Sequence, residues 1–343
     1  MSESPAFQKM KAEGTASKAP LTESFGQWKN AKIALIALVG LTMGQAVVWY
    51  TGQFYALFFM QSILKVDGYT SNLLIAWSLL LGTGFFVVFG WLSDKIGRKP
   101  IILAGCAIAV LTYFTIFARL TEVANPALYN AINNVKIEVT ANPAECGSLF
   151  NPVGTAKFTS SCDLGRQYLS SLSYKYTTKL DPAATATKVK IGETELVYDP
   201  TKAVDSQKAI SAAATSAGYP KAGDPSIVKM SNPLDIFRPQ VATIIGYLFV
   251  LILLVTMVYG PIAAMLVEFF PTKIRYSSMS LPYHIGNGWF GGLLPASAAA
   301  MVAQTGDIYY GLWYPIIFAA ITVVVGLLLV PETKDRDIFT YEN

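Results

Sequence analysis

Long apolar runs constrain this chain more than any other feature. A helix that crosses a bilayer needs about 20 mainly apolar residues, and six segments of the 343-residue sequence reach that length. They predict an all-α membrane protein with six transmembrane helices. The segments are, approximately, Ile33–Leu64, Leu73–Leu92, Ile101–Arg119, Val241–Phe270, Met279–Val302 and Tyr310–Val330.

Two of these segments carry features that disturb a straight helix. Ile33–Leu64 is too long for one straight crossing and too short for two helices with a turn, so we expect one long helix with a break near Gly52. Pro261 lies inside Val241–Phe270. A proline removes a backbone donor and kinks a helix, and membrane helices tolerate this where neighbouring groups satisfy the freed carbonyl.

The composition supports the membrane interpretation. The chain is 53% hydrophobic and 14% charged, whereas a soluble domain carries about 25% charged residues. Its net charge of +4 is too small to indicate a nucleic-acid partner. The first 30 residues are polar and contain no apolar core, so we expect no cleavable signal peptide. The first span should then act as the insertion signal.

Lys and Arg residues in the short loops predict the orientation, because cytoplasmic loops carry the excess of positive charge. The loops on one side are rich in them, and the loops on the other side are poor. We therefore expect a multi-pass protein of the cell (inner) membrane with both termini in the cytoplasm. The residues that set this orientation are Lys29, Lys32, Lys95, Arg98, Lys99, Lys273, Arg275, Lys334 and Arg336.

The polar segment 120–238 is predicted to lie outside the cytoplasm. It shows strand-like alternation at 188–191 and 195–198 around Gly192, which indicates a hairpin, and a helix-like stretch at 206–217. We interpret the segment as a small α+β extracytoplasmic insertion and find no functional motif in it.

The cysteines of the chain fall in two settings. Cys146 and Cys162 lie in the insertion, where an oxidising location favours a disulfide over two free thiols. Cys106 lies in the third span and is interpreted as a small packing residue.

The loop between the second and third spans carries the most specific motif. Gly90 could allow close helix approach, and Gly97 could allow a tight turn that a Cβ would resist. Asp94 ends one helix and could face the positive end of a neighbouring helix. Arg98 and Lys99 hold the loop on the cytoplasmic side, which a simple positive loop would also do. The motif reads Gly90-Trp91-Leu92-Ser93-Asp94-Lys95-Ile96-Gly97-Arg98-Lys99-Pro100.

This motif resembles the loop signature of the major facilitator superfamily. The stretches 268–278 and 283–295 resemble helices ten to eleven of its metabolite:proton symporter family, and the tail 331–334 resembles that of sugar-porter-like members. The resemblance implies a six-transmembrane-helix half of the superfamily fold, with helices seven to twelve. It also implies a cytoplasmic gate in which Arg98 pairs with Glu268. With Arg275, the motif residues Gly90, Asp94, Gly97, Arg98 and Lys99 and the partner Glu268 form the predicted gate.

The chain departs from that family in two respects. The family has twelve spans where this chain has six, and the insertion is longer than the usual loop. The other half could have been lost or could lie on another chain, or a second copy could replace it. The predicted organisation is a cytoplasmic linker at 1–30, transmembrane helices at 31–119 and 239–331, the insertion at 120–238 and a cytoplasmic tail at 332–343.

Polar residues within the spans mark a candidate substrate cavity. Gln45, Trp49 and Gln53 recur every four residues and so share one helix face. Buried amides need hydrogen-bond partners, which either a polar cavity or contact with another helix supplies. His284 and Asn287 are expected on one side of the fifth span, where the histidine could relay a proton or simply bond a carbonyl. Tyr50 and Tyr259 complete the set.

These features predict secondary active transport of a small polar metabolite, an organic acid or a zwitterion by family resemblance, through alternating access. No Asp or Glu lies in mid-span, so a proton-coupling carboxylate would belong to the missing half. The alternative is a non-transporting remnant, or a membrane anchor that displays an extracytoplasmic binding domain. We expect no enzyme, cofactor or metal site, because the spans hold one histidine and no paired carboxylates. The expected partners are the solute, the proton and the lipid bilayer.

Overall fold

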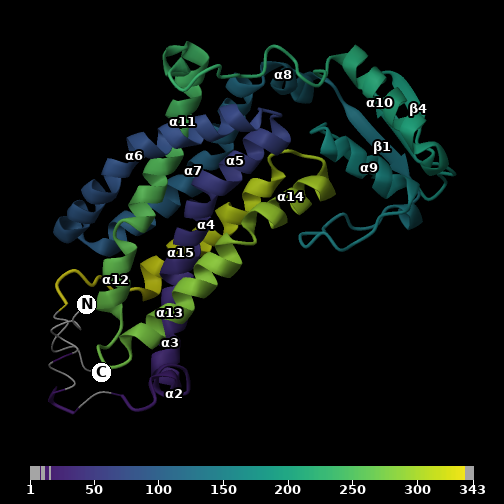
Figure 1. The fold of residues 1–343 in the computed structure, drawn as a ribbon. Helices are drawn as coiled ribbons and strands as arrows, with labels where there is room; N and C mark the ends of the chain where they lie inside the picture. Colours follow the sequence, from purple (N-terminus) through teal and green to yellow (C-terminus); the bar gives the residue numbers. More distant parts are fainter. Residues whose placement is uncertain (1–7, 9–11, 15–16, 337–343) are drawn as a thin grey trace.

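The computed structural model describes every residue except 1–7, 9–11, 15–16 and 337–343. Five helices in this described part are long and apolar enough to cross a membrane (Figure 1). They confirm the prediction of a helical membrane fold, while parts of the predicted linker and tail lie outside the described residues. The five helices are Trp28–Ile63, Gly68–Ile96 (α6), Arg98–Ala124 (α7), Pro239–Phe269 and Tyr310–Leu329.

The first span is continuous, so the expected break near Gly52 does not occur. Instead, the helix alternates between α and π geometry, and Gly52 lies inside a π segment. Such π segments are frequent at functional sites. The α segments are α3 (Trp28–Ala37), α4 (Met43–Tyr50) and α5 (Ala56–Phe58), and the π segments are η1 (Leu38–Thr42), η2 (Thr51–Tyr55) and η3 (Phe59–Ile63).

Pro261 separates α11 (Pro239–Tyr259) from α12 (Ile262–Phe269). The neighbouring Gly260 packs against α6: a Cβ there would lie 3.2 Å from the carbonyl oxygen of Phe86 and 3.4 Å from the backbone nitrogen of Gly90. A Cβ on Gly90 would meet nothing within 4 Å. The expectation that Gly90 permits the close helix approach is therefore wrong, since Gly260 provides it.

The predicted fifth span, Met279–Val302, is not one long helix. It consists of α13 (Arg275–Ile285), the π segment η7 (Gly286–Gly291) and α14 (Leu294–Thr305). Pro282 lies inside α13, and the glycines that follow lower the preference for α geometry. The last span is α15 (Trp313–Leu329), preceded by the 3₁₀ turn η8 (Tyr310–Leu312).

The first span lies at the centre of the bundle. Its α4 segment packs against α11, α15 and η7. Tyr55 and Phe59 are fully buried and contact Phe117 of α7, with ring centroids 5.6 and 5.0 Å apart. In contrast, α6 and α15 expose apolar side chains such as Val87 and Leu328, as expected of helices that face lipid or another protein.

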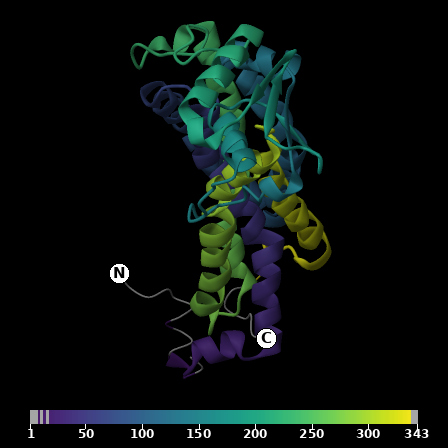
Figure 2. The ribbon, with the colours of Figure 1, turned by 90° about the vertical axis from the view of Figure 1, so that its right-hand side faces the viewer.

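The inserted domain, which we define as the residues between α7 and α11, lies at one end of the bundle. The helix α2 (Pro20–Phe25) lies at the opposite end (Figure 2). The helices of the inserted domain are α8 (Pro126–Asn134), α9 (Ser161–Ser171) and α10 (Ala203–Ala217), and its strands are β1 (Ile137–Ala141), β2 (Thr177–Leu180), β3 (Lys188–Ile191) and β4 (Thr194–Val197). Three short 3₁₀ turns join them: η4 (Pro143–Glu145), η5 (Pro200–Lys202) and η6 (Asp235–Phe237).

These strands form a four-stranded sheet within the described residues, in the order β2-β1-β3-β4. β1 and β2 are parallel, and the other two pairs are antiparallel. Val139 and Val189 pair across the sheet and are buried, and α10 packs against β3 and β4. The predicted α+β character is confirmed: the hairpin at Gly192 is β3–β4, and α10 contains the helix expected at 206–217.

Candidate functional site

Gly97 sets the local geometry of the loop between α6 and α7. Its φ of +112° is a conformation that residues with a side chain rarely adopt. A Cβ at this position would also collide with the carboxylate of Glu332. The tight turn lets α7 begin at Arg98, directly after the end of α6.

Arg98 is buried and bonds groups from two helices. Its guanidinium donates to Ser93 Oγ at 2.6 Å and to the carboxylate of Asp94, both on α6, and to Glu268 Oε1 of α12 at 3.1 Å. The Arg98 and Glu268 side chains are 11% and 14% exposed, whereas Asp94 is 61% exposed. The bond to Glu268 is therefore the less screened of the two ion pairs.

Glu332 binds the N-terminus of α7. Its carboxylate accepts the backbone N–H groups of Arg98 and Lys99, each at 3.0 Å, and those of Thr333 and Lys334. An anion is favoured there because the first N–H groups of a helix lack helical partners and carry partial positive charge. Burial alone would raise the pKa of Glu332, but these backbone hydrogen bonds hold it below its ordinary value.

The segment after α15 closes the network. Thr333 Oγ1 donates to Glu268 Oε2 at 2.7 Å, and Lys334 Nζ donates to the carbonyl of Lys95 at 2.9 Å. Lys99 Nζ donates to the carbonyls of Leu327 and Val330, near the end of α15. Side chains from three regions of the chain thus meet at one end of the bundle. We call Asp94, Arg98, Glu268, Glu332 and Thr333 the Arg98 cluster.

Sequence reasoning placed Arg275 in the same group, but the structure does not. Arg275 is buried and bonds its own loop, with Nε donating to the carbonyl of Phe270 and a terminal nitrogen to Thr272 Oγ1. Asp94 pairs with Arg98 rather than facing the N-terminus of a neighbouring helix, where Glu332 lies instead. Glu332 lies in the tail motif at 331–334 that resembles sugar-porter-like members, but the motif alone predicted no role for this residue.

An amide pair joins the first span to the interrupted span. Gln45 is fully buried on α4, and Asn287 lies on η7. The two amides bond each other reciprocally, at 3.3 and 3.4 Å, and Asn287 Nδ2 also donates to the carbonyl of Tyr283 at 3.0 Å. Each amide thereby satisfies part of its hydrogen-bonding capacity away from water.

Aromatic side chains extend this pair toward α11. Trp49 stacks on Tyr259, with ring centroids 5.9 Å apart, and contacts Tyr50 edge-on at 4.9 Å. The hydroxyls of Tyr259 and Tyr283 lie 3.1 Å apart. These rings are only partly buried. We call Gln45, Trp49, Tyr50, Tyr259, Tyr283 and Asn287 the amide–aromatic cluster, of which sequence reasoning missed Tyr283.

His284 lines a different surface from the Gln45–Asn287 pair, contrary to the expectation that it shares one side of the span with Asn287. It is exposed and lines a surface cavity of about 550 Å³ with Tyr276, Trp289 and residues of α2. The π segment that begins at Gly286 has a wider turn than an α-helix, so the angular offset between these positions differs from the one assumed. Gln53 is partly buried in η2. Within the described residues, no His, Cys, Asp or Glu group of three or more could hold a metal ion.

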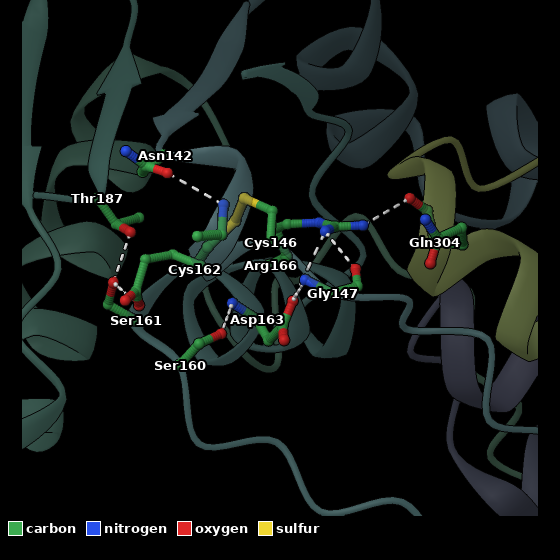
Figure 3. Close-up of a disulfide and its surroundings, with 12 residues drawn as sticks. Asn142, Cys146, Gly147, Ser160, Ser161, Cys162, Asp163, Arg166, Thr187 and Gln304 are labelled. Atoms are coloured by element: carbon green, nitrogen blue, oxygen red, sulfur yellow. Dashed lines mark hydrogen bonds and ion pairs between the residues drawn. A yellow bond between two sulfur atoms is a disulfide. The ribbon is translucent and has the colours of Figure 1, made fainter. Parts of the chain in front are cut away.

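Arg166 of α9 attaches the inserted domain to the bundle (Figure 3). Its buried guanidinium donates to the carbonyl of Gly147 at 3.1 Å and to the carbonyl of Gln304, on α14, at 3.0 Å. Tyr176 makes a parallel contact, since its hydroxyl donates to the carbonyl of Ala303 at 2.6 Å. These bonds fix the inserted domain to the C-terminal end of α14.

A disulfide holds this attachment in place. Cys146 and Cys162 are bonded to each other, with Cα atoms 5.2 Å apart. Gly147, next to Cys146, donates its N–H to Asp163 at 2.9 Å, and Asp163 lies 3.7 Å from Arg166. The bridge therefore joins the loop that carries Gly147 to the helix that carries Arg166.

Comparison with known proteins identifies the family. The model of the family described as "Sugar (and other) transporter" matches residues 2–140 and 237–343. The chain belongs to this transporter family. The matched residues make up more than half of the chain, and the resemblance to the major facilitator superfamily is confirmed. Residues 141–236, which hold most of the inserted domain, lie outside the match.

Two proteins of Haemophilus influenzae are similar to part of this chain, and both carry the name "Putative metabolite transport protein". One is 38% identical over 114 residues, which are 32% of this chain and 24% of the relative. The other is 29% identical over 115 residues, which are 33% of this chain and 25% of the relative. The chain thus spans about a quarter of the length of these relatives. No solved structure matches it.

The contacts of Glu332 predict an acid-sensitive attachment of the tail. Because its folded-state pKa is lowered, its contribution to stability is complete above the unfolded pKa of about 4.3. That contribution is lost as the pH falls through the folded value. Because the folded pKa lies below the unfolded one, protection of the Arg98 and Lys99 amides from hydrogen exchange, corrected for intrinsic rates, should persist through about pH 4.3 and be lost only at lower pH.

Glu332→Gln should weaken this protection already at neutral pH and remove its acid dependence. Glu122→Gln is the matched control, because Glu122 pairs with Arg119 at the other end of α7. If both variants behaved like the wild type, Glu332 would not hold the helix terminus.

The disulfide predicts a local stability effect. The cysteines are 16 residues apart, and closing a loop of that size stabilises a fold by about 3 kcal/mol. Replacing both Cys146 and Cys162 by serine should raise hydrogen exchange in α9 and at Gln304. Cys106→Ser, in the bundle, is the control and should leave α9 unchanged. Unaltered exchange in the double variant would show that the bridge is dispensable for the attachment.

Proposed function

We propose that this chain forms one half of a secondary active transporter for a small polar metabolite, an organic acid or a zwitterion. The observation that carries the proposal is the amide–aromatic cluster. Gln45 and Asn287 place polar groups between two spans, beside partly exposed Trp49 and Tyr259. Polar side chains at such positions commonly mark solute pathways, and aromatic rings with polar edges suit a small amphipathic solute.

The substrate would bind where this cluster faces the other half. Transporters of this kind place the site near the bilayer midplane between two repeats, which rock around it. Gln53 continues the face of Gln45 and Trp49, and we assign it to the same pathway. His284 lies on a different surface and takes no part in it.

The Arg98 cluster supports a gate at the cytoplasmic end. Its bonds join the loop after α6 to α12 and to the segment after α15, so opening this end would require Arg98 to exchange partners. We propose that Gly97, Lys99, Asp94 and Glu268 act with Arg98 in this gate. The orientation follows the positive loops, with the inserted domain outside the cell (inner) membrane.

Proton coupling, in this proposal, depends on the other half. The carboxylates of Asp94 and Glu268 lie near span ends and pair with Arg98. A titrating group that alternates between the two sides of the membrane would have to lie nearer the midplane. A missing half, or a second copy of this chain, would complete the solute pathway.

One observation favours a second function. The inserted domain holds buried apolar side chains and a disulfide, so the chain could serve as a membrane anchor that displays a binding domain. Such an anchor would need no solute pathway, and changes in the amide–aromatic cluster would leave its function intact.

Uptake measurements distinguish the two functions. Cells that express this chain together with its upstream coding region should accumulate labelled organic acids or betaine-like solutes, and cells that express either part alone should not. Uptake by the chain alone would indicate a dimer of halves. Absence of uptake in every combination, with the protein present in the membrane, would contradict transport and favour the display function.

A double-mutant cycle tests the amide pair. Gln45→Leu and Asn287→Leu each remove one partner of the pair, and Asn287→Leu leaves the buried Gln45 amide unpaired at a cost of about 1–3 kcal/mol; each should lower uptake at least tenfold in the assembled transporter. The double variant removes both amides and should regain stability. If Gln45 and Asn287 bind the solute, uptake should stay low; restored uptake would reduce the pair to a packing contact.

A further inference from the structure

A cavity of about 530 Å³ lies at the seam between the inserted domain and the bundle. Both parts of the molecule form its walls. Lys65 follows η3 of the first span, and Asn125 caps the start of α8. Tyr174, residues of α10 and the loop that contains Lys221 supply other lining residues from the inserted domain. This cavity is separate from the amide–aromatic cluster and from the Arg98 cluster.

The cavity carries positive charge without a counter-ion. Lys65 and Lys221 line it, and no Asp or Glu is among the lining residues. In the described part of the chain, neither lysine forms an ion pair. Lys65 Nζ donates to the carbonyls of Ser62 at 2.6 Å and Ser171 at 2.8 Å, which leaves one of its three N–H groups available. Desolvation lowers the pKa of Lys65, the direction expected where no carboxylate neutralises an ammonium.

The acidic residue nearest in sequence does not fill this role. Asp224 follows the lining residue Gly223, but its carboxylate accepts the backbone N–H of Ser226 at 2.9 Å and the Ser226 hydroxyl at 2.6 Å. These local bonds hold a turn at 224–226. An anion from outside the chain is therefore the group that would complete the cavity.

Backbone strain occurs at the same wall. In the described chain, the non-glycine residues with positive φ are Lys65, at +60°, and Ser173, at +61°. Each such residue costs about 1–2 kcal/mol. Ser173, which lies between the lining residues Leu172 and Tyr174, also donates to the carbonyl of Ser62. Both strained residues thus meet at one carbonyl, and strain of this kind recurs at ligand clamps.

The remaining lining residues indicate the chemical character of the uncharged part of the ligand. Leu128, Leu172 and Ile227 supply apolar surface, and Thr215 adds a hydroxyl. Inorganic phosphate would leave the apolar surface unused. An organic molecule with one anionic group and a short apolar body matches both the charge and the lining.

We propose that this seam cavity binds a small organic carboxylate, which pairs with Lys65 and Lys221 and packs its apolar part against Leu128 and Ile227. A lipid headgroup phosphate offers the same anionic chemistry, and the experiment separates the two sources. The proposal does not depend on transport. Bound ligand would hold the inserted domain against the first span, because the two lysines come from these two parts.

The test uses the full chain in nanodiscs of phosphatidylcholine, with benzoate as the probe and isosteric benzamide as the neutral control. Calorimetry should show saturable binding of benzoate and none of benzamide. Lys221→Gln, at an exposed position, should weaken benzoate binding about tenfold through loss of one charged contact. Lys190→Gln removes an equal charge from β3, outside the cavity, and should bind benzoate like the wild type.

Lys65→Gly separates binding from folding. Glycine adopts a φ of +60° without strain, so this variant should remain folded while it loses the ammonium and binds benzoate at least tenfold more weakly. Equal binding of benzoate and benzamide, or unchanged affinity in Lys221→Gln, would overturn the proposal. Loss of benzoate binding in phosphatidylglycerol nanodiscs would also overturn it, in favour of a lipid phosphate. Since uptake is not the readout, failure here leaves the proposed transport function unaffected.

Discussion

The burial of the Arg98 guanidinium is the constraint on which one end of this structure depends. A guanidinium stays charged at any physiological pH, so burying it requires anionic partners and hydrogen bonds in a fixed arrangement. Asp94 is too exposed to supply this alone, and Glu268 comes from α12, far along the chain. Glu332 then uses the N–H groups that the start of α7 leaves unpaired. The positions of α6, α7, α12 and the segment after α15 are thereby linked.

The sequence predicted the spans well because the bilayer imposes one simple length on them. The prediction of a continuous helix was wrong where proline and glycine residues, rather than hydropathy, determine the backbone conformation. Pro282 and the glycines at 286–292 divide an apolar segment that reads as one span. The π segment that begins at Gly286 also explains why Asn287 faces Gln45 while His284 faces away. No alternating pattern marks β2, whose four residues are all exposed, so pairing with β1 alone defines that strand.

The candidate site was predictable only in part, for a related reason. Arg98 and Glu268 lie in motifs whose charges must be satisfied, which suggested their pairing. The role of Glu332 was hidden because two of its partners are backbone amides more than 200 residues earlier, and backbone amides carry no sequence signal. Arg275 looked equivalent to Arg98, but a nearby carbonyl and a threonine hydroxyl satisfy it within its own loop.

The two ends of the bundle differ in the kind of bond that holds them, and this difference indicates which end can move. Arg98 and Glu268 are charged side chains that water can solvate again once they separate, so this ion pair can re-form after it breaks. At the other end, Arg166 and Tyr176 bond backbone carbonyls of α14, which would lose their partners if the contact opened. The disulfide further limits the loop beside Arg166. The inserted domain should therefore move with the bundle as one body, while rearrangement concentrates at the Arg98 cluster.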